Sequence, residues 1–117
     1  MSRVLIVEDD ASMVRLLQTL LGLEGHQAFS TARPDDVIST VRESQPQVVV
    51  MDLHLGQVNT LGIIKEIKGD PVLKSVPLII VSGLDAEDEC KLAGAEAFIL
   101  KPYSPGKLLD LIKQLAI

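Results

Sequence analysis

Short runs of apolar residues, separated by longer segments with helical periodicity, constrain the fold more than any other feature of the sequence. The runs span 4–7, 48–51, 78–81 and 97–100. Continuous apolar runs of this length, mostly β-branched, are typical of strands buried on both faces, as in a parallel sheet. A more polar segment, 27–31, follows Gly25, a helix-stop signal, and is expected to form a strand at the sheet edge.

The segments between these runs carry apolar residues at intervals of three and four, which is the period of an α-helix. Four such stripes are Met13, Leu16, Leu17, Leu20 and Leu21; Val37, Ile38 and Val41; Leu61, Ile64 and Ile67; and Leu108, Leu111, Ile112 and Leu115. Pro34 suits a first helical turn, and Ser104 before Pro105 resembles a helix N-cap. Strand and helix therefore alternate five times, which predicts an α/β fold with a doubly wound five-stranded parallel sheet and helices on both faces.

The composition is that of one folded domain, which we expect to span 1–117. The net charge is −5, whereas nucleic-acid recognition normally requires a basic patch, so no nucleic-acid partner is expected. No apolar run approaches the roughly 20 residues that cross a bilayer, which predicts a cytoplasmic protein without membrane attachment. Cys90 is the only cysteine, so an internal disulfide is excluded and a passive reduced thiol is expected.

Acidic residues gather where two of the predicted strands end. The first strand runs directly into Glu8, Asp9 and Asp10, and the third ends at Asp52. Ligands of open parallel sheets bind beyond the carboxyl ends of the strands. Two carboxylates about 4 Å apart repel by roughly 4 kcal/mol at an effective dielectric near 20, so such a cluster requires a cation or protons. The hard oxygen donors favour Mg²⁺.

Four motifs together resemble the receiver domains of response regulators in two-component signalling, over essentially the whole chain. They are Val-Leu-Ile-Val-Glu-Asp-Asp at 4–10, Val-Val-Val-Met-Asp-Leu at 48–53, Ile-Ile-Val-Ser-Gly at 79–83 and Phe-Ile-Leu-Lys-Pro at 98–102. The resemblance implies the strand order 2-1-3-4-5 and a cis peptide bond between Lys101 and Pro102. It assigns the family's acidic pair to Glu8 and Asp9, the phosphoacceptor to Asp52, the switch hydroxyl to Ser82 and the lysine to Lys101.

The same resemblance implies a mechanism. Mg²⁺ would be bound by Asp9, Asp52 and the backbone carbonyl of His54, with Glu8 acting through water. A histidine kinase or a histidine phosphotransfer protein would transfer its phosphoryl group to Asp52, assisted by Mg²⁺ and the Lys101 ammonium. Rearrangement of Ser82 and of Phe98 would then alter a surface that binds a downstream protein. Such a domain catalyses only its own phosphorylation and dephosphorylation.

The chain also departs from the usual receiver pattern. Gly56 and Thr60 stand where receivers carry Pro and Gly. If that Gly position required a positive φ, a β-branched Thr60 would be strained there, and the loop after Asp52 would be displaced. The interval from Ser82 to Lys101 is about one helical turn shorter than usual, which predicts a short fourth helix. Because the usual dimer or target surface includes this helix, the family's rules for that surface do not carry over to this chain. Phe98 replaces a common Tyr, so that its coupling to a partner would be steric.

Two other functions remain alternatives at this stage. A pseudo-receiver would keep the fold as a phosphorylation-independent protein-interaction module, which the altered loop favours and the complete set of charged residues opposes. A cobalamin-binding domain has similar architecture and loosely similar motifs at 52–56 and 82–84. However, a Gly-Gly pair would be expected where this chain has Lys101 and Pro102. Since no output region follows Ile117, the response is expected to act through another protein or a missing part of a longer chain. A homodimer is kept as a further alternative for the partner.

Overall fold

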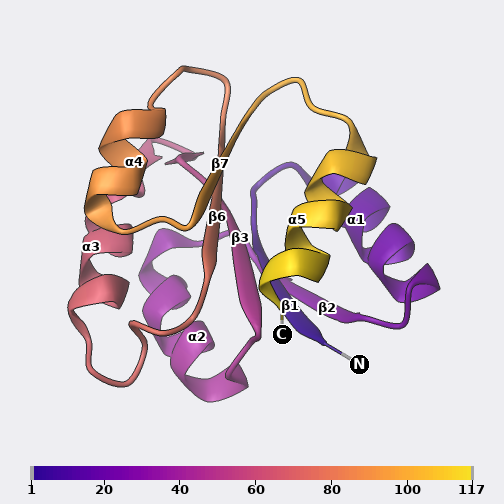
Figure 1. The fold of residues 1–117 in the computed structure, drawn as a ribbon, viewed down its shortest axis with the longest axis horizontal. Coiled ribbons are helices and arrows are strands. Elements are labelled where there is room, and N and C mark those ends of the chain that lie inside the picture. The colour runs from indigo at the N-terminus through magenta and orange to yellow at the C-terminus, as the bar shows by residue number, and fades with distance from the viewer. Residues whose placement is uncertain (1, 117) are drawn as a thin grey trace.

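A five-stranded parallel sheet forms the centre of the computed structural model, which describes residues 2–116 (Figure 1). Its strands are β1 (Arg3–Val7), β2 (Gln27–Thr31), β3 (Val48–Asp52), β6 (Leu78–Ser82) and β7 (Ala97–Leu100). They are arranged in the order β2-β1-β3-β6-β7, with every neighbouring pair parallel. This order confirms the predicted 2-1-3-4-5 arrangement. The first and last residues of the predicted 1–117 domain lie outside the described part of the chain.

Helices cover both faces of this sheet, as the alternation of strand and helix predicted (Figure 1). On one face lie α1 (Ala11–Leu23) and α5 (Pro105–Leu115); on the other lie α2 (Val37–Ser44), α3 (Leu61–Gly69) and α4 (Glu87–Ala93). The predicted first turn at Pro34 is a 3₁₀ turn, Pro34–Asp36, which leads into α2. With seven residues, α4 is as short as expected. Within residues 2–116, no helix is long and apolar enough to span a membrane.

The N-termini of α1 and α5 are capped by side chains, which explains where these two helices begin. Asp10 accepts hydrogen bonds from the backbone N–H groups of Ser12 and Met13, at 3.0 and 3.2 Å. Ser104 accepts one from the N–H of Lys107 at 3.2 Å. Such caps stabilise a helix by about 1 kcal/mol. Asp10 directly follows Glu8 and Asp9 in the sequence, but its carboxylate is the N-cap of α1.

Two hydrophobic cores lie on opposite sides of the sheet, because successive side chains of a strand point to opposite faces. The core under α1 and α5 comprises Val4, Ile6, Leu17, Leu21, Val48, Val50, Ile79, Val81, Ile99, Leu108 and Ile112. The core under α2, α3 and α4 includes Leu5, Val7, Val49, Met51, Ile64, Ile67, Leu78, Ile80 and Cys90. These cores fix the register of the strands, and therefore the positions of the residues that follow them.

The segment after β3 forms a small antiparallel hairpin that the sequence did not predict. Its strands are β4 (His54–Leu55) and β5 (Val58–Asn59), joined through Gly56, whose φ is +60°. Thr60 follows with a φ of −83°. The positive φ of this loop therefore lies at a glycine, and the steric strain considered for Thr60 is absent.

Candidate functional site

Three charged residues converge at the carboxyl ends of β1, β3 and β7 because of strand register and alternation. Ile6, Val50 and Ile99 are buried on the α1 and α5 face. Two positions after them in the sequence come Glu8, Asp52 and Lys101, respectively. Ile6 and Val50 are partners in the β1–β3 register, so Glu8 and Asp52 leave the sheet side by side. The peptide bond between Lys101 and Pro102 is cis, as the family resemblance implied.

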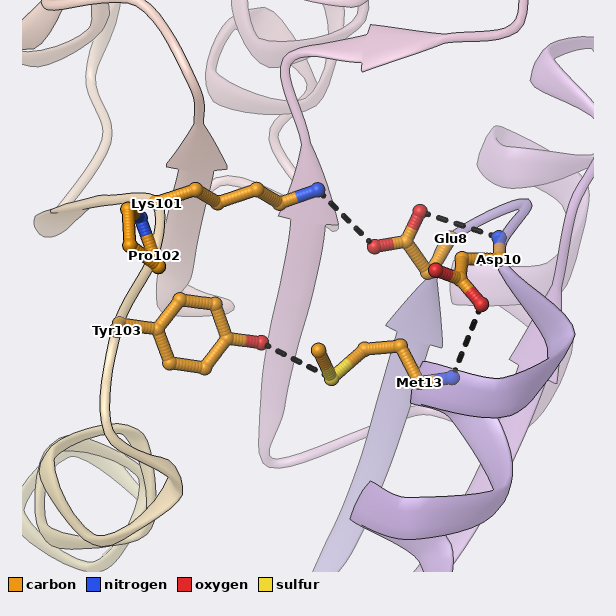
Figure 2. Close-up of a pocket in the computed structure, with 6 residues that line it drawn as sticks. All are labelled: Glu8, Asp10, Met13, Lys101, Pro102 and Tyr103. Atoms are coloured by element: carbon orange, nitrogen blue, oxygen red, sulfur yellow. Dashed lines mark hydrogen bonds and ion pairs between the residues drawn. The ribbon is translucent and has the colours of Figure 1, made fainter.

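The Lys101 ammonium lies between the two buried carboxylates. Its Nζ is 2.7 Å from Asp52 Oδ2 and 3.4 Å from Glu8 Oε1; the latter contact is drawn in Figure 2. The Glu8 and Asp52 side chains are 8% and 9% exposed, whereas that of Lys101 is 33% exposed. One ammonium therefore faces two carboxylates in a poorly solvated place.

Asp9 brings a third carboxylate to the cluster. Glu8, Asp9 and Asp52 each offer an oxygen, and these three oxygens lie within 4.8 Å of one another. Asp9 is the exposed member, and its Oδ2 accepts a hydrogen bond from the Gly56 N–H at 3.0 Å. The cluster thus contains three carboxylates and one ammonium, and the carboxylates supply hard oxygen donors. This donor set fits Mg²⁺, which needs only one or two carboxylates and retains several waters.

Backbone N–H groups orient the two buried carboxylates. Glu8 Oε2 accepts from the N–H groups of Asp9 and Asp10 at 3.0 and 3.3 Å. Asp52 Oδ1 accepts from the His54 N–H at 3.0 Å. In each carboxylate, one oxygen is therefore held by the backbone and the other faces Lys101. This arrangement limits rotation of both groups before any ligand arrives.

The hairpin determines which backbone groups face the cluster. The Thr60 N–H donates to the Leu53 carbonyl at 2.7 Å, and the next pair, His54 with Asn59, belongs to the same ladder. Hydrogen-bonded and non-hydrogen-bonded pairs alternate in antiparallel ladders, so His54 directs its N–H and C=O away from β5. Its N–H reaches Asp52 on that side. In an extended residue the carbonyl leaves on the same side as the N–H, so the ladder pattern is compatible with the metal ligand that the resemblance placed at the His54 carbonyl.

Burial and neighbouring charges perturb the titration of this site. Burial raises the pKa of the Glu8 carboxyl, and the nearby Asp52 charge adds to the rise, although Lys101 opposes it. Burial alone would lower the pKa of Lys101, but its hydrogen bond to Asp52 and the attraction of Asp52 and Glu8 outweigh burial and raise it. Lys101 is therefore held as an ammonium at neutral pH.

A hollow of about 410 Å³ adjoins the cluster and contains residues that the sequence did not single out for the site (Figure 2). It is lined by Glu8, Asp10, Met13, Lys101, Pro102 and Tyr103. The Tyr103 hydroxyl points at the Met13 sulfur, 3.6 Å away. Burial raises the pKa of Tyr103. Met13 was interpreted only as part of a helical stripe, and the one available signal for Tyr103 was its position two residues after Lys101.

The two predicted switch residues lie on neighbouring strands, Ser82 on β6 and Phe98 on β7. Ser82 is fully buried, and its Oγ accepts a hydrogen bond from the Leu84 N–H at 3.0 Å. Phe98 is half-buried and pairs with Ile80 in the β6–β7 register. By strand alternation, Ser82 and Phe98 belong to the α2, α3 and α4 face, whereas Asp52 belongs to the opposite face. The two residues thus share one side of the sheet, close to the end of β6.

Comparisons with known sequences point to one family. The family model described as the response regulator receiver domain matches residues 4–113. The polar-differentiation response regulator DivK of Brucella anthropi is 30% identical over 113 residues, which cover 94% of this chain and 92% of that protein. DivK of Brucella ovis matches with the same identity and coverage.

Solved structures share the fold over nearly the whole chain. The signal receiver domain of a response regulator from Bermanella marisrubri has a TM-score of 0.89 at 25% identity, covering 98% of both chains. The receiver domain of the sensor histidine kinase PA1611 from Pseudomonas aeruginosa has a TM-score of 0.85 at 19% identity, covering 98% of this chain and 97% of that one. In that protein a magnesium ion is coordinated in the active-site cleft.

Proposed function

The chain belongs to the response regulator receiver domain family, and from this premise we propose that residues 1–117 form one phosphoacceptor domain of two-component signalling. A histidine kinase or a histidine phosphotransfer protein donates the phosphoryl group, and Asp52 accepts it. The observation that carries this proposal is the buried Asp52 carboxylate, 2.7 Å from the Lys101 ammonium and grouped with two further carboxylates. Buried carboxylates with a fixed orientation and a cationic neighbour are suited to nucleophilic attack on a phosphoryl group.

In the transfer step, an Asp52 oxygen forms a bond to phosphorus while the bond between phosphorus and the donor imidazole nitrogen breaks. The electron pair of the broken bond stays on the imidazole. The His54 N–H, 3.0 Å from Asp52 Oδ1, keeps the carboxylate from turning during the attack. The Lys101 ammonium, which already bridges toward Glu8, is placed to balance charge on the phosphoryl oxygens.

Asp9, Asp52 and the His54 carbonyl are the groups that would hold Mg²⁺ directly, and Glu8 would act through water. Glu8 already uses one oxygen on backbone N–H groups and directs the other to Lys101, which suits an indirect role. When bound, Mg²⁺ neutralises the phosphoryl oxygens and the excess negative charge of the carboxylates. The exposed Asp9 is the carboxylate that can adjust most easily to an incoming ion.

Signalling then depends on Ser82 and Phe98. Phosphorylation adds strong acceptor oxygens, and the Ser82 hydroxyl would leave the Leu84 N–H to donate to one of them. Movement of the 82–84 loop alters the space on the same side of the sheet that Phe98 occupies. A phenyl ring has no hydroxyl, so its effect on a downstream protein is steric. The domain is therefore a switch that catalyses only its own phosphorylation and dephosphorylation.

Intact-mass analysis after incubation with acetyl phosphate and Mg²⁺ tests the phosphoacceptor role. Wild type is expected to gain one phosphoryl adduct. Asp52→Asn and an EDTA-treated sample are expected to gain none. Asp110→Asn, which changes an exposed carboxylate on α5, serves as the matched control and should still be modified. Absence of an adduct on folded wild type with several phosphodonors would favour the pseudo-receiver.

A further inference from the structure

Two of the backbone donors that orient the acidic cluster come from one short segment. The N–H of His54 holds Asp52 Oδ1, and the N–H of Gly56 holds Asp9 Oδ2, both at 3.0 Å. Both donors belong to the β4–β5 hairpin. The positions of two carboxylates consequently depend on the register of this hairpin.

Thr60 closes the hairpin with two hydrogen bonds to consecutive residues. Its N–H donates to the Leu53 carbonyl at 2.7 Å, and its hydroxyl donates to the Asp52 carbonyl at 3.0 Å. Leu53 is also tied to β6, because its N–H donates to the Val81 carbonyl at 2.8 Å. The main chain at 52–53 is therefore fixed from two sides, by the sheet and by Thr60.

The Thr60 side chain is completely buried, so its hydroxyl bond is not exchanged with solvent. A slip of the hairpin by one residue would exchange the two kinds of ladder pair and turn the His54 N–H and C=O toward β5. The second bond made by Thr60 opposes this slip, because a side-chain hydroxyl can reach the Asp52 carbonyl only in the observed register. A glycine, the residue usual at this position, would keep the backbone N–H bond to Leu53 but has no hydroxyl to bond the Asp52 carbonyl.

We infer that Thr60 is a positioning residue for the acidic site: its buried hydroxyl fixes the register of the β4–β5 hairpin and so presents the His54 and Gly56 backbone to Asp52 and Asp9. The inference rests on the proposed function for its biological meaning, but the arrangement itself can be tested without phosphorylation. Residues that orient ligands from outside the first coordination sphere alter metal affinity by about 10- to 100-fold when removed.

The test compares Thr60→Val, which keeps the size and removes the hydroxyl, with Thr60→Ser, which keeps the hydroxyl. Thr19→Val is the matched control, because the Thr19 hydroxyl also donates to a backbone carbonyl, that of Arg15 at 2.9 Å, but on an exposed part of α1. Amide hydrogen exchange of His54 and Gly56 is measured without metal by NMR. Mg²⁺ affinity is then measured by titration of the same amide resonances.

In Thr60→Val, exchange at His54 and Gly56 is expected to be about tenfold faster, since one buried hydrogen bond is lost. Mg²⁺ affinity should fall by about tenfold, the lower end of the range for indirect ligands. Thr60→Ser and Thr19→Val should both match wild type in the two measurements. If Thr60→Val does not fold, Thr60→Ala removes the hydroxyl without placing a methyl group against the carbonyl and replaces it in the comparison.

A loss of global stability in Thr60→Val with unchanged exchange at His54 and Gly56 would overturn the inference and leave Thr60 as a core residue. Failure of Thr60→Ser to restore the wild-type values would also overturn it. If wild type binds no Mg²⁺ and accepts no phosphoryl group, the proposed function fails. The metal-free exchange data still decide the role of Thr60 in that case.

Discussion

Replacing Lys101 with methionine should destabilise the metal-free protein in a manner that depends on pH. The methionine side chain keeps much of the apolar stem and removes the ammonium that lies 2.7 Å from Asp52 and 3.4 Å from Glu8. Two buried carboxylates then face each other without a cation. Desolvation and mutual repulsion of these groups are the cause of the expected loss, because the cores and the helix caps are unchanged.

The size of the effect follows from the geometry. Two charges 4.8 Å apart, the upper limit for the carboxylate oxygens, repel by about 3.5 kcal/mol at an effective dielectric of 20. Removal of one partner from a buried ion pair costs about 3 to 5 kcal/mol. The Lys101 side chain is 33% exposed, so solvent screening reduces the contribution. We expect Lys101→Met to lower the free energy of unfolding by about 2 kcal/mol at pH 7.

Urea unfolding followed by circular dichroism measures this loss, with Lys113→Met, an exposed lysine of α5, as the control. Because the folded protein raises the pKa of Lys101, its contribution is complete below the ordinary value of 10.5 and is lost as the pH rises through the raised value. The stability difference between wild type and Lys101→Met should also narrow in acid, because the raised pKa of Glu8 lets that carboxyl become protonated first. It should narrow at pH 7 in saturating Mg²⁺ as well. A deficit that is absent at pH 7, or constant across the pH range, would refute this electrostatic reasoning.

Two further predictions concern stability away from the site. The hydrogen bond from Arg42 to Asp70, 2.8 Å long, lowers the pKa of the Asp70 carboxyl below its ordinary value of 3.8. Asp70→Asn should therefore reduce stability at neutral pH, and in urea unfolding its difference from wild type should shrink as the pH falls below 3.8 and through the lowered pKa of the folded protein. Gly94 ends α4 with a φ of +116°, and an added Cβ would lie 2.5 Å from Lys68 Cγ. Gly94→Ala should lower the free energy of unfolding by about 1 to 3 kcal/mol in the same assay, and an unchanged midpoint would contradict the strain expected at this position.

The sheet could be predicted from the sequence because its three central strands, β1, β3 and β6, are buried on both faces and form continuous apolar runs. The run 48–51, for example, lacks polar residues. The observed strands differ from the predicted ones by at most one residue at either end. The acidic cluster was predictable for the same reason. Parallel strands end at one edge, so Glu8 and Asp52 could be assigned to the same place before any distance was known.

The β4–β5 hairpin could not be predicted in this way. Its strands contain two residues each, which is too short for a period of two to be recognised. The turn depends on the positive φ of Gly56, and the sequence did not indicate whether Gly56 or position 60 would adopt that conformation. The burial of the Thr60 hydroxyl could not be predicted either, since a threonine after a polar loop is usually exposed.

The site therefore has two sources of order with different strength. Glu8, Asp52 and Lys101 extend strands whose register is fixed by two hydrophobic cores, and a change in the site cannot easily displace them. Asp9 and the His54 backbone depend on a hairpin held by a few hydrogen bonds, in which local opening requires less free energy than unfolding of the sheet. Substitutions in 53–60 should consequently alter metal affinity and phosphorylation rate while the fold is retained. Substitutions in the strand cores should instead reduce stability first.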